Sequence, residues 1–281
     1  MLNLLLPYPA ALVKNENTKT LLIADPHLGW EMQLQKKGIH VPSQTSKILN
    51  KLITIISEYK PDRLVILGDV KYTVVSHELG EWHDIPDFFS KLQKYISNIA
   101  IVRGNHDANL EPLLPKNIEL WQASGAVIGD VGVFHGHKWP SPALIGCKTL
   151  IMGHLHPVVA FRDPAGFKIT RQVLMRARCN TDALLQILLH KNGVRIKGSA
   201  AETLKKQYNI TPKAMEIFIM PSFNDFLGGR PINETKPKNE IGSDKLIGPV
   251  LRSEAVDVDE AEIYLLDGTF LGTLNQLRQL Q

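Results

Sequence analysis

Three short apolar runs in the first part of the chain each end in a cluster of polar side chains. The runs are Thr20–Ala24, Arg63–Leu67 and Ile99–Val102. Apolar runs of this length with polar boundaries are typical of strands buried on both faces. The residues that follow them are Asp25-Pro26-His27, Gly68-Asp69 and Arg103-Gly104-Asn105-His106-Asp107. The pattern therefore predicts three buried strands that present polar groups at their ends.

Segments with helical periodicity separate these strands. Residues Ser43–Tyr59 place their aliphatic side chains on one face, with Ser43 as the expected N-cap, and a second helix is expected at Asp87–Ile96. Alternating strands and helices predict a parallel sheet with right-handed crossovers. Ligands of such sheets bind at the carboxyl ends of the strands, where all three polar clusters lie.

Hairpin signals replace this alternation in the second half of the chain. Ala126–Ile128 and Val131–Phe134 flank a Gly-Asp turn, and Val158–Phe161 and Phe167–Thr170 flank Asp163-Pro164-Ala165-Gly166. Two apolar runs again lead into histidines, in His135-Gly136-His137 after Phe134 and in Gly153-His154-Leu155-His156 after Met152. We expect a second, more antiparallel sheet packed on the first.

The remaining signals are weaker. Strands are expected at Leu184–Leu189 and Glu216–Met220, and a terminal hairpin within Ala261–Leu271. Residues 233–244 are polar, contain proline and glycine and lack periodicity, which predicts a mobile loop. No segment reads as a clean linker, so we expect one domain over residues 1–281.

Composition narrows the class of protein. The 281 residues are 44% hydrophobic and 21% charged, which is ordinary for a folded globular protein. The net charge of +4 tolerates an anionic substrate without demanding a nucleic acid. Two isolated cysteines argue against a disulfide framework or a cysteine zinc site. The apolar start, Met1–Val13, is short and broken by prolines, and no run is long enough for a membrane helix. We therefore predict a cytoplasmic protein without a membrane partner.

The polar clusters have the chemistry of metal ligands. Asp25 and His27 are two residues apart, so in an extended segment their side chains would point the same way, and His154 and His156 repeat that spacing. Asp69 can bridge two ions through its two oxygens. Mixed nitrogen and oxygen ligation suits Mn, Fe, Zn, Ni or Co better than Mg or Ca.

The ordered set D-x-H, G-D, G-N-H-D, H-G-H and G-H-x-H, from Asp25 to His156, resembles the calcineurin-like metallophosphoesterase superfamily. The resemblance implies an α/β fold of four layers, a metallophosphoesterase sandwich with two mixed β-sheets flanked by helices. It also implies two divalent transition-metal ions, manganese first among the candidates. Its ligand roles are Asp25, His27 and His156 for one ion, Asn105, His135 and His154 for the other, and Asp69 between them.

The same resemblance implies a reaction. Two ions about 3.5–4 Å apart can polarise a phosphoryl oxygen and share a hydroxide that attacks phosphorus. His106 would assist the leaving group, and Asp107 would orient His106 or brace its loop. The expected activity is therefore hydrolysis of phosphodiesters, with phosphomonoesters as an alternative.

Several positions keep two interpretations. His137 can replace His135 as a ligand or can contact the substrate phosphate, and Arg103 can steer phosphate or form a structural salt bridge. His77 and His83 follow Asp69 and can reach the cleft, although isolated histidines are usually structural. The tryptophans Trp30, Trp82 and Trp139 suit packing better than base stacking. Tyr72 departs from many family members, which carry an acidic residue or histidine at that place.

Longer stretches narrow the resemblance. Residues 24–31, 68–71 and 135–140, together with Pro221-Ser222-Phe223-Asn224 and residues 266–272, resemble archaeal SbcD-related phosphoesterases. Kinship with a repair nuclease suggests a second function, a DNA or RNA exo- or endonuclease. Such an enzyme needs a basic groove, for which the candidates are Lys36, Lys37, Lys71, Arg103 and Lys138. A binding scaffold without metals is a third function, but none of the expected ligands is replaced. The natural substrate and the oligomeric state stay open.

Overall fold

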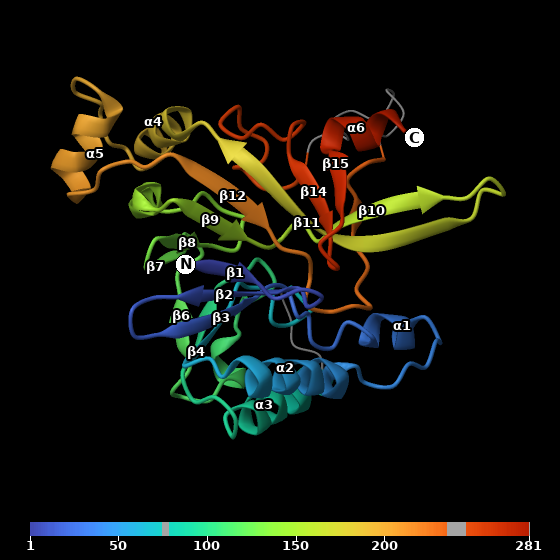
Figure 1. The fold of residues 1–281 in the computed structure, drawn as a ribbon. Helices are drawn as coiled ribbons and strands as arrows, with labels where there is room; N and C mark the ends of the chain where they lie inside the picture. Colours follow the sequence, from blue (N-terminus) through green and yellow to red (C-terminus); the bar gives the residue numbers. More distant parts are fainter. Residues whose placement is uncertain (75–78, 235–245, 281) are drawn as a thin grey trace.

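The computed structural model describes residues 1–74, 79–234 and 246–280 and contains two stacked β-sheets (Figure 1). The first sheet has the strand order β1-β2-β3-β4-β5-β6. Its strands are β1 (Leu2–Leu4), β2 (Ala10–Lys14), β3 (Lys19–Ile23), β4 (Arg63–Ile66), β5 (Ile99–Val102) and β6 (Glu119–Trp121). Strands β3, β4 and β5 are parallel, as the sequence predicted, and β6, which was not predicted, extends the parallel part. Strands β1 and β2 add an antiparallel edge.

The second sheet is mixed and has the order β13-β10-β11-β12-β9-β8-β7, with β14 paired to β11 and to β15. Its strands are β7 (Ala126–Ile128), β8 (Val131–Val133), β9 (Thr149–Met152), β10 (Pro157–Arg162), β11 (Lys168–Cys179), β12 (Met215–Ile219), β13 (Arg230–Pro231), β14 (Glu262–Leu265) and β15 (Phe270–Thr273). The three predicted hairpins are present. Strand β12 comes from far along the chain and lies parallel to β9, in the middle of the sheet.

Helices cover both outer faces (Figure 1). The helices are α1 (Met32–Lys36), α2 (Thr45–Tyr59), α3 (Leu79–Leu92), α4 (Thr181–Lys191), α5 (Ala200–Tyr208) and α6 (Leu274–Gln279), with 3-10 turns at Glu111–Leu113 and Pro142–Gly146. Buried side chains of α2 and α3 pack on the first sheet, and those of α4 and α6 pack on the second. A third cluster, which includes Leu22, Val65, Ile151 and Met220, fills the space between the sheets. The result is the predicted order of four layers: helices, sheet, sheet, helices.

One predicted element was wrong, and one predicted helix has different bounds. Leu184–Leu189 is not a strand but the centre of helix α4, whose N-cap Asn180 accepts a hydrogen bond from the Ala183 amide. A run of six residues with one polar position, Gln186, is too short to reveal its period, so it fits a buried helix as well as a strand. Helix α3 begins at Leu79, earlier than predicted, and contains Pro86.

Smaller differences concern helix starts and segments at the limits of the structure. The N-cap of α2 is Gln44, although the Ser43 hydroxyl accepts a hydrogen bond from the Thr45 amide. Most of the loop predicted at 233–244 lies outside the described residues, as does His77. Within the described part of the chain, no helix is long and apolar enough to cross a membrane.

Candidate metal centre

The structure brings the predicted ligands together from both sheets. They lie just beyond the strands that precede them in the chain: Asp25 and His27 after β3, Asp69 after β4, Asn105 and His106 after β5, His135 after β8, and His154 and His156 after β9. Because the two sheets stack, the ends of these strands face one another across one cleft. Two groups of side chains in it can each hold a metal ion, and Asp69 belongs to both.

The first group consists of Asp25, His27, Asp69 and His156. The Nε2 atoms of His27 and His156 are 3.3 Å apart. Nε2 of His27 is also 3.5 Å from Oδ2 of Asp69, and Nε2 of His156 is 3.4 Å from Oδ2 of Asp25. The side chains of Asp25, His27 and Asp69 are almost completely buried, so the group is shielded from water on most sides.

The second group consists of Asp69, His135 and His154, with Asn105 beside it. Nε2 of His135 is 3.1 Å from Nδ1 of His154, 3.1 Å from Oδ1 of Asn105 and 3.4 Å from Oδ2 of Asp69. The opposite ring nitrogen of His135 donates a hydrogen bond of 2.7 Å to the Leu67 carbonyl. That bond leaves the lone pair of Nε2 pointing into the group when the ring is neutral.

Both groups fit divalent cations. Carboxylate oxygens, an amide oxygen and imidazole nitrogens converge with their lone pairs facing one another, which is repulsive unless a proton or a metal ion lies between them. Oδ1 of Asp25 and Nδ1 of His27 are buried and make no hydrogen bond within the described residues. Mixed nitrogen and oxygen donors of this kind suit first-row transition metals.

The backbone at the centre is strained. Five of the eight described non-glycine residues with positive φ are Asp25, His27, Asp69, His154 and His156, with φ from 43° to 68°. The left-handed region costs an L-residue about 1–2 kcal/mol, and such residues cluster at functional sites. The D-x-H spacing was interpreted as an extended segment, and this prediction of the local backbone is wrong. The pairs Asp25/His27 and His154/His156 converge through left-handed turns and not through a strand.

Hydrogen bonds from distant parts of the chain hold the Asp25–His27 turn. The amides of Asp25 and His27 donate to the carbonyls of Gly68 and Asp69, at 3.2 and 3.0 Å. The buried Ser222 hydroxyl donates to the Asp25 carbonyl at 2.6 Å, and the side-chain amide of Asn224 donates to the Pro26 carbonyl at 3.2 Å. No role was predicted for Ser222 and Asn224 beyond the resemblance of the Pro-Ser-Phe-Asn stretch.

Gly104 shows why a glycine precedes Asn105. A Cβ atom at Gly104 would lie 2.1 Å from Oδ1 of Asp69 and 2.3 Å from the Asp69 backbone nitrogen. The loop that follows β5 therefore lies directly against the residue shared by the two groups. Because Gly104 has no side chain, the Asp69 carboxylate can come close enough to accept a hydrogen bond of 2.8 Å from the His106 backbone amide.

His106 lies at the edge of the centre, and Asp107 lies beneath it. Nδ1 of His106 is hydrogen-bonded to the Tyr72 carbonyl, and its Nε2 is 3.9 Å from Oδ2 of Asp69. The buried Asp107 carboxylate accepts hydrogen bonds of 2.8 Å from the amides of Asp69, Val70 and Gly104. Asp107 therefore braces the two loops, and the carbonyl of Tyr72 orients His106.

The other predicted contact residues have different surroundings. Arg103 forms an ion pair with Glu111, as its structural interpretation expected. The ring of His137 lies 5.1 Å from that of His135, and its buried Nδ1 makes no hydrogen bond within the described residues. His137 belongs to neither ligand group, whereas His135 does. His83 is largely exposed on α3 and pairs with Asp84.

Burial and the neighbouring aspartates shift the pKa values of these histidines in opposite directions. Burial lowers the pKa of His27 to about 3, and burial together with the neighbouring His135 lowers that of His154 to about 4. Burial also acts on His135, but Asp69 and Asp25 outweigh it and raise the pKa of His135 to about 9. Burial and the charge of Asp69 raise the pKa of Asp107 to about 6. In the metal-free protein one proton on His135 therefore offsets part of the carboxylate charge.

The centre opens into a cleft of about 490 Å³. The predicted residues that line this cleft are His27, Asp69, Asn105, His106, His154 and His156. Its other lining residues are Tyr72, Leu155, Leu227, Gly228, Gly229 and Ile247. A small ester can therefore reach the ligand groups from outside.

Comparison with known proteins identifies the family. The model of the calcineurin-like phosphoesterase family matches residues 18–176, which include every predicted ligand. The chain belongs to this family and is a metal-dependent phosphoesterase. The family and the two Asp/His groups together indicate a dinuclear site for divalent metal ions.

Solved structures give weaker likenesses. Pseudomonas putida nuclease MPE is 16% identical with a TM-score of 0.46, and the match covers 92% of this chain and 97% of that one. The E. coli phosphoesterase Yfce is 14% identical with a TM-score of 0.36, over 90% of this chain and 96% of that one. These values are too low to carry the substrate of either protein over to this chain. A search of curated proteins found no match.

Proposed function

We propose that this chain hydrolyses phosphodiesters with two divalent metal ions, of which manganese is the first candidate. The supporting observation is the pair of imidazole contacts on either side of Asp69, 3.3 Å between His27 and His156 and 3.1 Å between His135 and His154. Nitrogen pairs at these separations, each beside a carboxylate, have the composition of two adjacent ligand shells.

The assignments follow from these groups. Asp25, His27 and His156 would hold one ion, Asn105, His135 and His154 would hold the other, and Asp69 would bridge them. Ions bound there supply Lewis-acid polarisation of a phosphoryl oxygen and neutralise developing negative charge. The strained, buried backbone fixes the ligands before the ions arrive, so little reorganisation accompanies binding.

His106 is the candidate proton donor. With Nδ1 bound to the Tyr72 carbonyl, the ring directs Nε2 toward the cleft beside Asp69. Because Nδ1 carries the hydrogen that is donated to the Tyr72 carbonyl, the ring holds a second proton on Nε2 only as the imidazolium. That proton can pass to the ester oxygen as its bond to phosphorus breaks, which leaves a neutral imidazole, and a positioned acid of this kind contributes about 10²–10⁴-fold to rate. Asp107 supports the reaction through the three backbone amides that it binds.

The charge of the cleft favours diesters over monoesters. Its lining within the described residues includes no lysine or arginine, and the nearby Arg103 is paired with Glu111. A phosphomonoester dianion carries one more charge than a diester and would need additional cations around its non-bridging oxygens. The single charge of a diester can be met by the metal centre alone.

The nuclease alternative has less support. Of the five basic residues suggested for a groove, Lys71 is fully buried and donates to the carbonyls of Thr73 and Val74, and Arg103 is paired. The other three, Lys36, Lys37 and Lys138, are exposed, and none of them lines the metal cleft. The scaffold alternative has no support, because no expected ligand is replaced in the sequence and six of the seven belong to the two groups that could hold a metal ion.

The test is hydrolysis of bis(p-nitrophenyl) phosphate and p-nitrophenyl phosphate, with Mn²⁺ and with chelator. Zn²⁺, Ni²⁺ and Co²⁺ replace Mn²⁺ in parallel. We expect diester turnover that requires the metal and falls at least a hundredfold in His106→Ala, with Mn²⁺ affinity retained. His83→Ala, an exposed histidine of α3, serves as the matched control. Metal-loaded, folded protein that hydrolyses neither ester would refute the proposal.

A further inference from the structure

A second hollow, of about 830 Å³, adjoins the metal cleft. His154 and Ile247 line both spaces, so a group bound in one lies next to a group bound in the other. The volume is in the range of about 300–1,000 Å³ that is typical of small-molecule sites. A substrate whose phosphorus lies at the metal centre can therefore extend one of its ester groups into this hollow.

The walls of the hollow are largely apolar. Trp139, Ile187, Ile247 and Pro249 contribute to them. Trp139 and Ile187 are half-buried and pack against the core of the second sheet, which restricts their movement. A fixed indole beside aliphatic side chains favours a flat aromatic occupant, because such a ring buries a large area and stacks on the indole.

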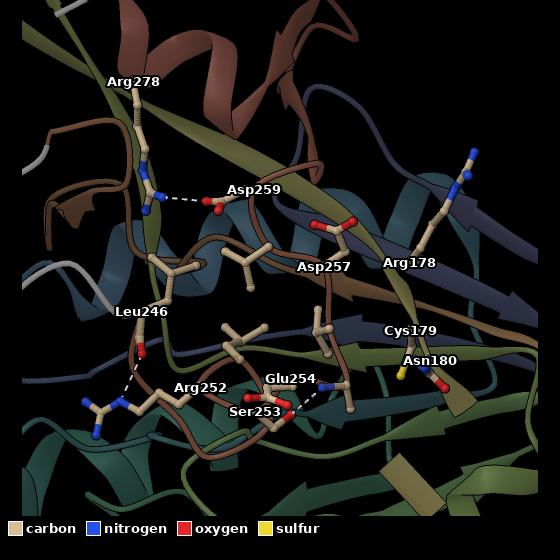
Figure 2. Close-up of a pocket in the computed structure, with 14 residues that line it drawn as sticks. Arg178, Cys179, Asn180, Leu246, Arg252, Ser253, Glu254, Asp257, Asp259 and Arg278 are labelled. Carbon is tan, nitrogen blue, oxygen red and sulfur yellow. Dashed lines mark hydrogen bonds and ion pairs between the residues drawn. The ribbon is translucent and has the colours of Figure 1, made fainter. Parts of the chain in front are cut away.

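Two residues of opposite charge also line the hollow. They are Arg252 and Glu254, and both also line the next hollow, in which Figure 2 labels them. The Nε of Arg252 donates to the Leu246 carbonyl at 3.0 Å, which orients its guanidinium group. The Glu254 carboxylate in the same lining disfavours a second phosphate. A neutral ring with donors and acceptors on its edge can use both side chains.

The wall beside Ile247 is held close to the metal loops. A Cβ atom at Gly248 would lie 2.7 Å from the Gly136 carbonyl oxygen and 3.7 Å from the His154 ring, and φ there is +92°. The backbone of residues 247–249 therefore packs directly on the loop that carries His135 and His137. This contact sets the distance between the hollow and the ligand groups.

We propose that this hollow binds the nucleobase of a nucleotide-derived phosphodiester, stacked on Trp139, while the phosphorus lies at the metal centre. The inference rests on the proposed function for the position of the phosphorus. The wall that the hollow shares with the metal cleft places the base next to the metal centre. The indole of Trp139 provides the stacking surface, and the side chains of Arg252 and Glu254 provide contacts for the edge of the base.

Binding of adenosine to chelator-treated protein tests the subsite without catalysis. Titration calorimetry would compare the native chain with Trp139→Ala, Trp139→Phe and the control Phe167→Ala, which removes an exposed ring at the tip of the β10–β11 hairpin. Loss of a stacking ring weakens base binding by about tenfold. We expect that loss in Trp139→Ala, substantial recovery in Trp139→Phe and no change in Phe167→Ala. Equal binding by native protein and Trp139→Ala would overturn the proposal.

A second variant covers the case in which Trp139→Ala does not fold. Ile187→Trp fills the hollow from α4 and should abolish adenosine binding. With Mn²⁺, it should also raise KM for thymidine 5′-(p-nitrophenyl phosphate) at least tenfold more than KM for methyl p-nitrophenyl phosphate. Adenosine binding that survives the filled pocket would count against the subsite.

The two proposals fail separately. Turnover of methyl p-nitrophenyl phosphate, together with adenosine binding that ignores both substitutions, would refute the subsite and keep the phosphodiesterase. Adenosine binding that depends on Trp139, without hydrolysis of either ester, would refute the phosphodiesterase and keep the subsite.

Discussion

The hydroxyl of Ser222 donates a hydrogen bond of 2.6 Å to the backbone carbonyl of Asp25, 197 residues earlier in the chain. The same hydroxyl accepts the Asn224 amide hydrogen at 3.1 Å, so it is fully engaged within a buried segment. This contact joins the segment that follows β12 to the left-handed turn that carries Asp25 and His27. The metal centre thus depends on a residue that binds no metal.

Ser222→Ala should weaken metal binding. The substitution leaves the buried Asp25 carbonyl without this donor, at a cost of about 1–3 kcal/mol, and frees a strained turn. We expect Mn²⁺ affinity to fall about 10–100-fold, as for other residues that orient ligands. Calorimetric titration with Mn²⁺ measures this. Ser46→Ala, at an exposed position of α2, is the control, and equal affinities in both variants would contradict the prediction.

Asp107→Asn should destabilise the fold more than it alters the chemistry. An asparagine has one acceptor oxygen, so its side-chain NH₂ group would face at least one of the three backbone N–H groups that now donate to the carboxylate. We expect a loss of about 1–3 kcal/mol in the free energy of unfolding, measured by urea denaturation. Asp130→Asn removes only the partner of an exposed ion pair with Lys213, which water screens, so this control variant should be nearly as stable as the native chain. A variant as stable as the native chain would show that Asp107 is not a brace.

Metal binding should strengthen as pH rises toward 9. The pKa of His135 in the metal-free protein is raised from 6.5 to about 9, so at pH 7 the ring is protonated and must release its proton before it can bind an ion. Release of one proton makes affinity rise about tenfold per pH unit below 9. By the same shift, protonated His135 stabilises the metal-free fold below pH 6.5, and this contribution is lost as pH rises through about 9.

Calorimetry of Mn²⁺ binding at pH 7, in two buffers of different ionisation enthalpy, counts the protons released. We expect close to one from the native chain and fewer from His135→Gln. Identical heats in the two buffers would mean that His135 is already neutral.

Both thiols should be unreactive in the folded protein. Burial raises the pKa of Cys147 and of Cys179 to about 11, and both cysteines are free. At pH 8 the thiolate, which is the reactive form, is therefore scarce. A chromogenic disulfide reagent should label neither thiol in the native state within minutes and both after denaturation. Rapid labelling of the native protein would contradict the prediction.

Sequence patterns predicted what is local and repeated. The buried runs that end in Asp25, Asp69 and Asn105 became parallel strands, because their periodicity and their polar ends agree on one topology. Because each of these ligands directly follows its strand in the sequence, the strands alone predicted that the ligands lie at one edge of the structure. The identity of the ligand types and their spacing were enough to indicate a metal centre.

Other features depend on contacts that a pattern does not contain. The turns of His27 and His154 are held by contacts with other loops, since the His27 amide donates to the Asp69 carbonyl and the His154 amide donates to the Asp25 carboxylate. The role of Ser222 likewise depends on a contact between distant residues. Helix α4 was mistaken for a strand because four leucines in Leu184–Leu189 are buried among few polar positions. The residue that indicated a helix here was the N-cap Asn180, which the pattern of hydrophobic positions does not take into account.

The place of β12 has a consequence for how the enzyme matures. Strand β12 lies between β9 and β11, and the segment that follows it contacts the Asp25 turn, so residues 215–224 contribute both to the second sheet and to the support of the first ligand group. During synthesis the N-terminal strands leave the ribosome long before these residues do. We therefore expect a nascent chain that already contains every proposed ligand, but not these residues, to bind metal ions more weakly than the full chain.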